Sequence, residues 1–185
     1  MIPPSAGPPA RPPAPLPLRR LGPDDWATIA RVRLTALADA PEAFYSTLGA
    51  EEHRTEAEWR AGATTAAWFA ALDADGAPAG LAAVVHGGPP PGDAMLVSMW
   101  VAQTYRGSGL AAHLVAAALD AAAEAGEERL TLWVRTGNLR AIRAYERMGF
   151  AVQDPPPQAH DYRCEGELFM ARAVAAAGRR GPGSP

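Results

Sequence analysis

Hydrophobic and polar residues alternate along the chain with two different periods, which together predict a fold of helices and strands. Apolar residues at helical spacing predict four helices, at residues 22–41, 50–62, 107–125 and 138–149. Short apolar runs predict seven strands, at residues 17–22, 66–72, 79–87, 94–101, 129–134, 150–154 and 167–172. An Asp75-Gly76 turn joins the second and third strands as a hairpin. Strands connected both by helices and by a hairpin indicate a mixed α/β sheet.

The composition is that of a folded domain with a small net charge. The 185 residues are 48% hydrophobic, which is enough to build a core. The net charge of −3 and the lack of a basic cluster argue against a nucleic-acid partner. No apolar run reaches the roughly 20 residues that span a bilayer, and the single cysteine, Cys164, has no second cysteine to pair with. We therefore expect a cytoplasmic protein without a membrane partner.

The two ends of the chain differ from its centre. Residues 1–16 are rich in proline, which predicts a disordered or polyproline-like tail. Residues 175–185 are rich in glycine and arginine and are predicted to be a second disordered tail. The helices and strands between them predict one domain over residues 17–174.

The stretch QTYRGSGLAAHL, residues 103–114, stands between a predicted strand and a predicted helix. Glycines at such a junction let backbone N–H groups approach a ligand closely, and the start of a helix favours negative charge. Arg106 adds a positive charge. This segment alone predicts either a phosphate site or an ordinary helix start. It lacks the Gly-Lys-Ser/Thr of a P-loop and the third glycine of a dinucleotide-binding loop.

A second motif follows about 30 residues later. In NLRAIRAYERMGF, Asn138, Ala141 and Tyr145 share one face of the predicted helix. The pair V-x-x-x-Y-R-G-S-G-L-A and N-x-x-A-x-x-x-Y-E-R-x-G-F resembles the GNAT family, the GCN5-related N-acetyltransferases. The close resemblance covers residues 95–152, and the order of elements resembles the family over most of 17–172. One position departs from the family pattern, because Thr104 stands where Gln or Arg is usual.

The resemblance implies a mostly antiparallel central sheet flanked by helices, the acyl-CoA N-acyltransferase fold, and acetyl-CoA as co-substrate. It implies that backbone amides of the loop hold the pyrophosphate and that the preceding strand binds the pantetheine arm, with the Val101 N–H polarising the thioester carbonyl. Tyr145 is implied as the general acid that protonates the leaving thiolate. The residues implied to contact the cofactor are Met99, Trp100, Val101, Arg106, Gly107, Ser108, Gly109, Leu110, Ala111, Asn138, Ala141 and Tyr145.

The acceptor amine must lose a proton, because an alkylamine with a pKa near ~10.4 is almost fully charged at neutral pH. The catalytic bases we expect are Glu51 and Glu52, since the start of the second helix often borders the acceptor site in the family. The other candidates are Asp93, His86, His160 and, through water, Ser98. The four histidines lack metal-ligand spacing, so we expect no metal.

The acceptor itself is only loosely indicated. Residues 34–52 resemble a segment that forms one wall of the acceptor cleft in many bacterial GNAT enzymes, and nearby aromatic residues are Phe44, Tyr45, Trp59 and Trp68. An acidic chain suits a cationic small molecule, such as an aminoglycoside, a polyamine or another amino compound. Acetylation of a protein N-terminus or lysine, and a regulatory module that binds acetyl-CoA without catalysis, remain open alternatives. The family also makes a homodimer possible.

Overall fold

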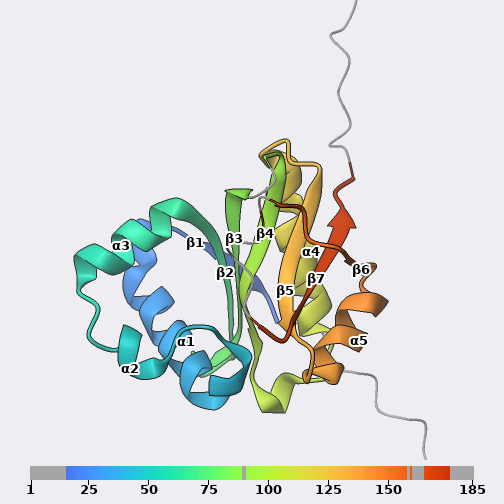
Figure 1. Ribbon diagram of the computed structural model, residues 1–185. Coiled ribbons are helices and arrows are strands. Elements are labelled where there is room, and N and C mark those ends of the chain that lie inside the picture. The colour runs from blue at the N-terminus through green and yellow to red at the C-terminus, as the bar shows by residue number, and fades with distance from the viewer. Residues whose placement is uncertain (1–15, 89–90, 158, 160–164, 176–185) are drawn as a thin grey trace, which may run out of the picture.

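Figure 1 shows a twisted sheet with helices on both of its faces. This computed structural model describes residues 16–88, 91–157, 159 and 165–175. The strands are β1 (Leu18–Leu21), β2 (Ala66–Leu72), β3 (Pro78–Gly88), β4 (Asp93–Val101), β5 (Arg129–Arg135), β6 (Ala151–Gln153) and β7 (Glu167–Ala173). The α-helices are α1 (Trp26–Asp39), α2 (Leu48–Glu51), α3 (Glu56–Thr65), α4 (Leu110–Glu124) and α5 (Leu139–Arg147). Short 3-10 helices occupy Pro23–Asp25, Pro41–Ala43 and Gln103–Tyr105.

The strand order is β1-β2-β3-β4-β5-β7-β6. Every neighbouring pair is antiparallel except β4 and β5, which run parallel and are joined by α4. The predicted mixed, mostly antiparallel sheet is therefore confirmed. The hairpin between β2 and β3 turns at Gly76, where the carboxylate of Asp73 accepts hydrogen bonds from the N–H groups of Asp75 and Ala77.

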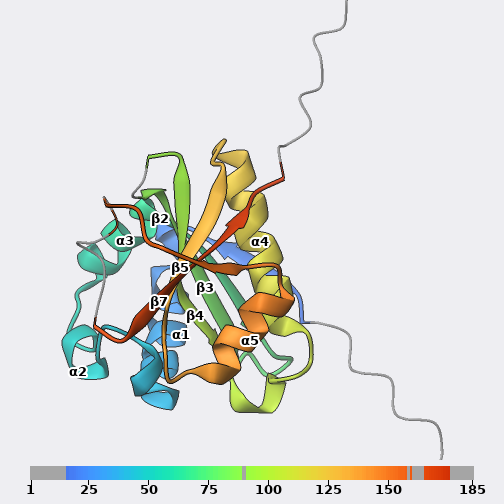
Figure 2. The same cartoon turned by 45° about the vertical axis from the view of Figure 1, so that its right-hand side comes forward.

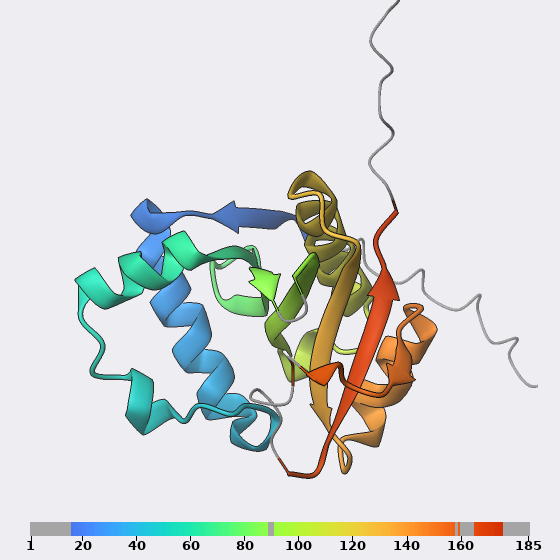
Figure 3. The same ribbon diagram turned by 45° about the horizontal axis from the view of Figure 1, so that its top comes forward.

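Two apolar layers hold the helices to the sheet. One core lies under α4 and includes Leu114, Val115 and Leu132. The other lies under α1 and α3 and includes Ile29, Leu37 and Trp59. Figures 2 and 3 show α1–α3 on one face of the sheet and α4 with α5 on the other. No helix in the described ranges is long and apolar enough to cross a membrane.

The helix predicted over residues 50–62 is in fact two helices, α2 and α3, separated by the residues between Glu51 and Glu56. The reason is a capping box. The Thr55 side chain accepts a hydrogen bond from the Glu58 N–H, and the Glu58 carboxylate accepts one from the Thr55 N–H. These bonds start a new helix at the position where helical spacing alone predicts continuation.

Candidate active site

The sheet opens between β4 and β5. These strands pair only over Asp93–Met95 and Arg129–Thr131. Beyond that point β4 carries a bulge, because the pairs Ala83–Val97 and Leu81–Trp100 set two residues of β4 against one of β3. A bulge bends the strand that carries it, which accounts for the separation of the two strands. Ser98 at the bulge has a φ of 56°, a conformation that non-glycine residues rarely adopt.

The end of β4 presents a backbone N–H to this opening. The Ala102 N–H donates to the carbonyl oxygen of Ala79 on the β3 side, at 2.9 Å. Because N–H groups of successive residues in a strand point to opposite edges, the Val101 N–H points away from β3. The Val101 carbonyl accepts a hydrogen bond from Arg106 Nε at 3.0 Å, which fixes the end of the strand.

The glycine-rich segment forms a turn before α4. The helix begins at Leu110, three residues later than the predicted start, because Gly107 and Gly109 adopt φ values of 84° and 89° that are not helical. The Ser108 hydroxyl donates to the Tyr105 carbonyl at 2.7 Å and braces the turn. The first amides of a helix have no partner inside it, so the start of α4 offers several N–H donors and the positive end of the helix dipole.

Arg106 makes structural contacts at this turn. Besides its bond to Val101, its Nη2 lies 3.3 Å from the carboxylate of Asp39, at the end of α1. The same carboxylate accepts a hydrogen bond from the Trp100 indole at 2.9 Å. Arg106 and Asp39 therefore tie the glycine turn, the end of β4 and α1 together.

Helix α5 supplies the second motif. Asn138 is its N-cap, and its side-chain oxygen accepts a hydrogen bond from the Ala141 N–H at 3.1 Å. Tyr145 is buried and packs edge-on against Phe150, with ring centroids 5.6 Å apart. Burial raises the pKa of the Tyr145 hydroxyl well above its usual value, so the hydroxyl is protonated at neutral pH.

These three segments border one cavity of about 770 Å³, between the end of β4, the start of α4 and the inner face of α5. Most residues predicted to contact a cofactor line it, namely Met99, Trp100, Val101, Arg106, Gly107, Gly109, Ala111, Asn138, Ala141 and Tyr145. Ser108 and Leu110 are not among its lining residues. The Leu110 side chain is instead 1% exposed in the core, packed where Gly80 of β3 leaves room for it.

The two glutamates predicted as bases lie elsewhere, because neither Glu51 nor Glu52 lines the cavity. Glu51 is buried and accepts two hydrogen bonds from Arg33, at 2.8 and 3.1 Å. Burial alone would raise the pKa of Glu51, but hydrogen bonds from Arg33 and Ser46 and the charge of Arg33 lower it below its usual value. This is the environment of a structural ion pair. Glu52 is exposed at the end of α2.

The other base candidates are also engaged or lie outside the cavity. Asp93 is buried in an ion pair with Arg129, at 2.7 Å. His86 lies 3.0 Å from Glu127. Ser98 shapes the bulge, and His160 lies outside the described residues.

Of the aromatic residues expected along the acceptor wall, Phe44 and Trp59 are buried under the guanidinium groups of Arg33 and Arg54. Trp68 donates its indole N–H to the Gly62 carbonyl, and Tyr45 is 86% exposed. Phe44, Trp59 and Trp68 belong to the core under α1 and α3, and none of the four aromatic residues lines the cavity.

One carboxylate that the sequence reasoning missed lines the cavity. Glu42 lies in the short 3-10 helix after α1 and is exposed. The signal that points to it is its place within residues 34–52, the segment that resembles an acceptor wall. In the part of the chain that the structure describes, no group of three or more His, Cys, Asp or Glu residues is arranged to hold a metal ion.

Comparisons with known proteins give a family match and similar solved structures. The sequence profile of the acetyltransferase (GNAT) family matches residues 34–150. Mycothiol acetyltransferase from Corynebacterium aurimucosum is 39% identical over 54 residues, which are 29% of this chain and 18% of that protein. The chain therefore matches less than a fifth of this relative's length.

Two solved structures share the architecture. A GNAT-family acetyltransferase from Streptococcus pneumoniae has a TM-score of 0.69 at 18% identity, covering 86% of this chain and 99% of that one. A nourseothricin acetyltransferase has a TM-score of 0.52 at 28% identity, covering 60% of this chain and 66% of that one.

Proposed function

The chain belongs to the GNAT acetyltransferase family, and from this premise we propose that it transfers the acetyl group of acetyl-CoA to a primary amine of a small molecule. The observation that carries the proposal is the single cavity where the end of β4, the start of α4 and Tyr145 of α5 meet. Each of these three parts supplies a group that the aminolysis of a thioester needs.

The start of α4 is the site proposed for the pyrophosphate. The amides of residues 107–111 and the helix dipole favour an anion there, and the two positive-φ glycines leave its approach open. Arg140 and Arg147 of α5 also line the cavity and add positive charge. Met99–Val101 form the strand edge along which the amide-bearing pantetheine arm would lie, with Asn138 on the facing helix.

The reaction that this geometry supports is direct attack. The amine nitrogen bonds to the carbonyl carbon, and the Val101 N–H donates to the carbonyl oxygen as negative charge develops on it. A donor of this kind is typically worth about 3–4 kcal/mol. The carbon–sulfur bond then breaks, and the leaving sulfur takes the proton of the Tyr145 hydroxyl. The nitrogen loses its extra proton as it becomes an amide, and that proton restores the Tyr145 hydroxyl through solvent. Because burial raises the pKa of Tyr145, the hydroxyl is protonated before the reaction.

The attacking amine must first be neutral. At neutral pH only about one alkylamine molecule in a thousand is unprotonated, a handicap of roughly 4–5 kcal/mol. We assign the removal of that proton to Glu42, directly or through water, because its carboxylate lines the same cavity as Tyr145. This replaces Glu51 and Glu52 as the base.

A small-molecule acceptor is supported by the relatives, whose names refer to mycothiol and nourseothricin. The test is thiol release from acetyl-CoA with amino sugars, polyamines, amino acids and peptides as acceptors. Release with a small amine but not with peptides is expected. Release with peptides alone would contradict the small-molecule proposal. Binding of acetyl-CoA without release for any amine would indicate a binding module.

A further inference from the structure

Asp39 places a negative charge at the C-terminal end of α1, of which it is the last residue. This end of a helix is already the negative end of the helix dipole, and the last turn of α1 contains no basic residue. The charge is therefore unfavourable within α1. It is offset outside the helix, because one carboxylate oxygen accepts hydrogen bonds from the Trp100 indole at 2.9 Å and from Arg106 Nη2 at 3.3 Å. The contacts of Asp39 with the end of β4 and the glycine turn account for its charge, and helix stability does not.

The two donors hold the backbone on both sides of the Val101 N–H. Trp100, whose indole binds Asp39, supplies the carbonyl half of the peptide that carries this N–H. On the other side, the Val101 carbonyl accepts a hydrogen bond from Arg106 Nε at 3.0 Å. The N–H of that following peptide donates to a carbonyl of β3 at 2.9 Å. The direction of the Val101 N–H is therefore set by two anchors, and Asp39 binds the side chains of both.

Asp39 also begins the segment that carries Glu42. The chain leaves α1 at Asp39 and forms the short 3-10 helix Pro41–Ala43. Glu42 follows Asp39 by three residues, a reach of at most about 11 Å. Glu42 lines the cavity, as do Trp100 and Arg106, whereas Asp39 does not. Asp39 thus connects the carboxylate side of the cavity to its β4 side from outside the cavity.

We propose that Asp39 is a positioning residue for the acetyl transfer, which holds the Val101 N–H in a fixed place relative to Glu42. The inference rests on the proposed function, in which Glu42 frees the amine and the Val101 N–H binds the carbonyl oxygen of the thioester. The amine and the carbonyl carbon must meet at about 3–3.5 Å, and a displacement of about 1 Å can cost about 100-fold in rate. A carboxylate suits this task because it accepts from both donors at once. Its charge also keeps the Arg106 guanidinium on α1 and away from the phosphates of a cofactor.

The experiment measures kcat and both KM values of Asp39→Ala and Asp39→Asn over a range of pH, by initial rates of thiol release from acetyl-CoA. The melting temperature of each variant, with and without acetyl-CoA, reports folding and cofactor binding separately. The matched control is Asp25→Ala, which also removes an aspartate–arginine pair, since Asp25 lies 2.8 Å from Arg19. The side chains of Asp25 and Asp39 are similarly exposed, at 32% and 34%, and Asp25 does not line the cavity.

Asp39→Ala should lower kcat by about 10- to 100-fold and leave the KM for acetyl-CoA nearly unchanged, because orientation is lost and the pyrophosphate site is not. Asp39→Asn should restore part of kcat, since its amide oxygen still accepts a hydrogen bond. It also keeps the shape of the side chain, so it carries the test if Asp39→Ala does not fold. The loss should be the same at every pH, because Asp39 takes no proton from the substrate. Asp25→Ala should keep the kcat of the wild type.

Unchanged kcat in the Asp39 variants, or an equal loss in Asp25→Ala, would overturn this inference alone. A loss that shrinks as the pH rises would mean that Asp39 acts as a base. A loss of acetyl-CoA binding with unchanged kcat would mean that Asp39 only shapes the cofactor turn. Either result also overturns the positioning role. Absence of thiol release by the wild type with every amine would overturn the proposed acetyl transfer and this inference with it.

Discussion

Tyr145 combines an observed packing contact with a proposed role as the general acid. Its ring packs edge-on against Phe150, the residue lines the cavity, and burial raises the pKa of its hydroxyl. Packing alone would hold the ring equally well without the hydroxyl. The two roles can therefore be separated by a change that removes only the oxygen.

Tyr145→Phe is expected to lower kcat at least about 100-fold, since general acid catalysis is typically worth 10²–10⁴-fold. The KM for acetyl-CoA and the melting temperature should change little, because the ring and its contact with Phe150 remain. Thiol-release kinetics measure the first quantities and thermal unfolding the last. Unchanged kcat would exclude Tyr145 as the acid.

Glu42→Gln should lower kcat/KM for the acceptor by about 10- to 100-fold at neutral pH if Glu42 takes the proton of the amine. The loss should shrink at high pH, where a larger share of the amine is already neutral. The matched control is Glu52→Gln, which removes a carboxylate outside the cavity. The measurement is kcat/KM for the acceptor as a function of pH in both variants. A loss that does not change with pH would argue against Glu42 as the base.

Glu51→Gln is expected to destabilise the fold by about 3 kcal/mol, because it leaves the buried Arg33 guanidinium without its counter-charge. The pKa of Glu51 is lowered in the folded protein, so its stabilisation is present above the unfolded value of 4.5 and is lost as the pH falls below it. Denaturant unfolding at several pH values should show the variant and wild type converging in acid. A gap that persists there would contradict this ion-pair account.

At the scale of elements, the glycine turn before α4 decides where the first helical amides point. Gly107 and Gly109 both have positive φ, and a Cβ at either would meet no atom within 4 Å. The requirement for glycine is therefore conformational rather than steric. The break between α2 and α3 is a second feature that local backbone geometry sets. A capping box starts α3 at a position where helical periodicity alone predicts a continuous helix.

Gly109→Ala should cost about 1–2 kcal/mol of stability and raise the KM for acetyl-CoA several-fold, because relief of the strained φ shifts the amides of the turn. Gly76→Ala is the matched control, since Gly76 has a φ of 77° in a hairpin turn and does not line the cavity. It should cost similar stability and leave KM unchanged. Equal effects of both variants on KM would show that the turn does not position the cofactor.

At the scale of the whole molecule, the seven strands form one sheet, and the β4–β5 opening divides it into β1–β4 on one side and β5, β7 and β6 on the other. The carboxylate of Asp39 on α1 accepts hydrogen bonds from Trp100 of β4 and from Arg106 of the glycine turn. These bonds join residues more than 60 positions apart in the sequence and connect α1 to the cavity. The described strands begin at Leu18 and end at Ala173, in keeping with the domain predicted over residues 17–174. The bounds of that domain remain a prediction.

A shortened chain of residues 16–175 should therefore fold and work like the full chain. We expect a melting temperature within about 2 °C of the full-length value and the same kcat, because no described contact is removed. Thermal unfolding and thiol release on the two proteins test this. A large loss of either would show that the proline-rich or glycine-rich end takes part in the fold or in the reaction.

The sequence by itself determined the order of elements, the mixed sheet and most of the residues on β4, α4 and α5 that line the cavity. These features depend on local chemistry, namely the spacing of apolar residues, the glycines before α4, and the Asn138 cap with Tyr145 seven residues later on the same helix. A local motif carries its own geometry, because its hydrogen bonds join residues a few positions apart.

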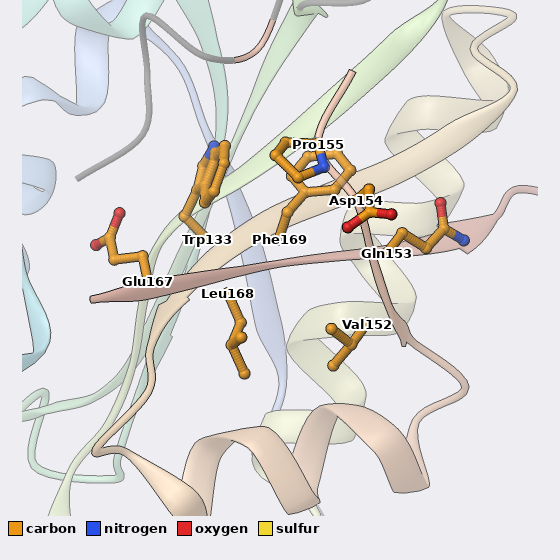
Figure 4. A pocket seen from close by; sticks show the side chains of 8 residues that line it. All are labelled: Trp133, Val152, Gln153, Asp154, Pro155, Glu167, Leu168 and Phe169. Atoms are coloured by element: carbon orange, nitrogen blue, oxygen red, sulfur yellow. The ribbon is translucent and has the colours of Figure 1, made fainter. Parts of the chain in front are cut away.

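Only the tertiary structure decided which carboxylate lines the cavity. Glu42 lines the cavity while Glu51 is held by Arg33, although nothing in the local sequence distinguishes two glutamates in one acidic segment. Trp133 and Asp154 likewise line one cavity of about 400 Å³ (Figure 4) only because β5, β7 and β6 pair side by side. Of the two glutamates, one is buried with a cation, and the other is exposed in the cavity. This difference depends on contacts between residues far apart in the chain, and those contacts exist only once the sheet has formed.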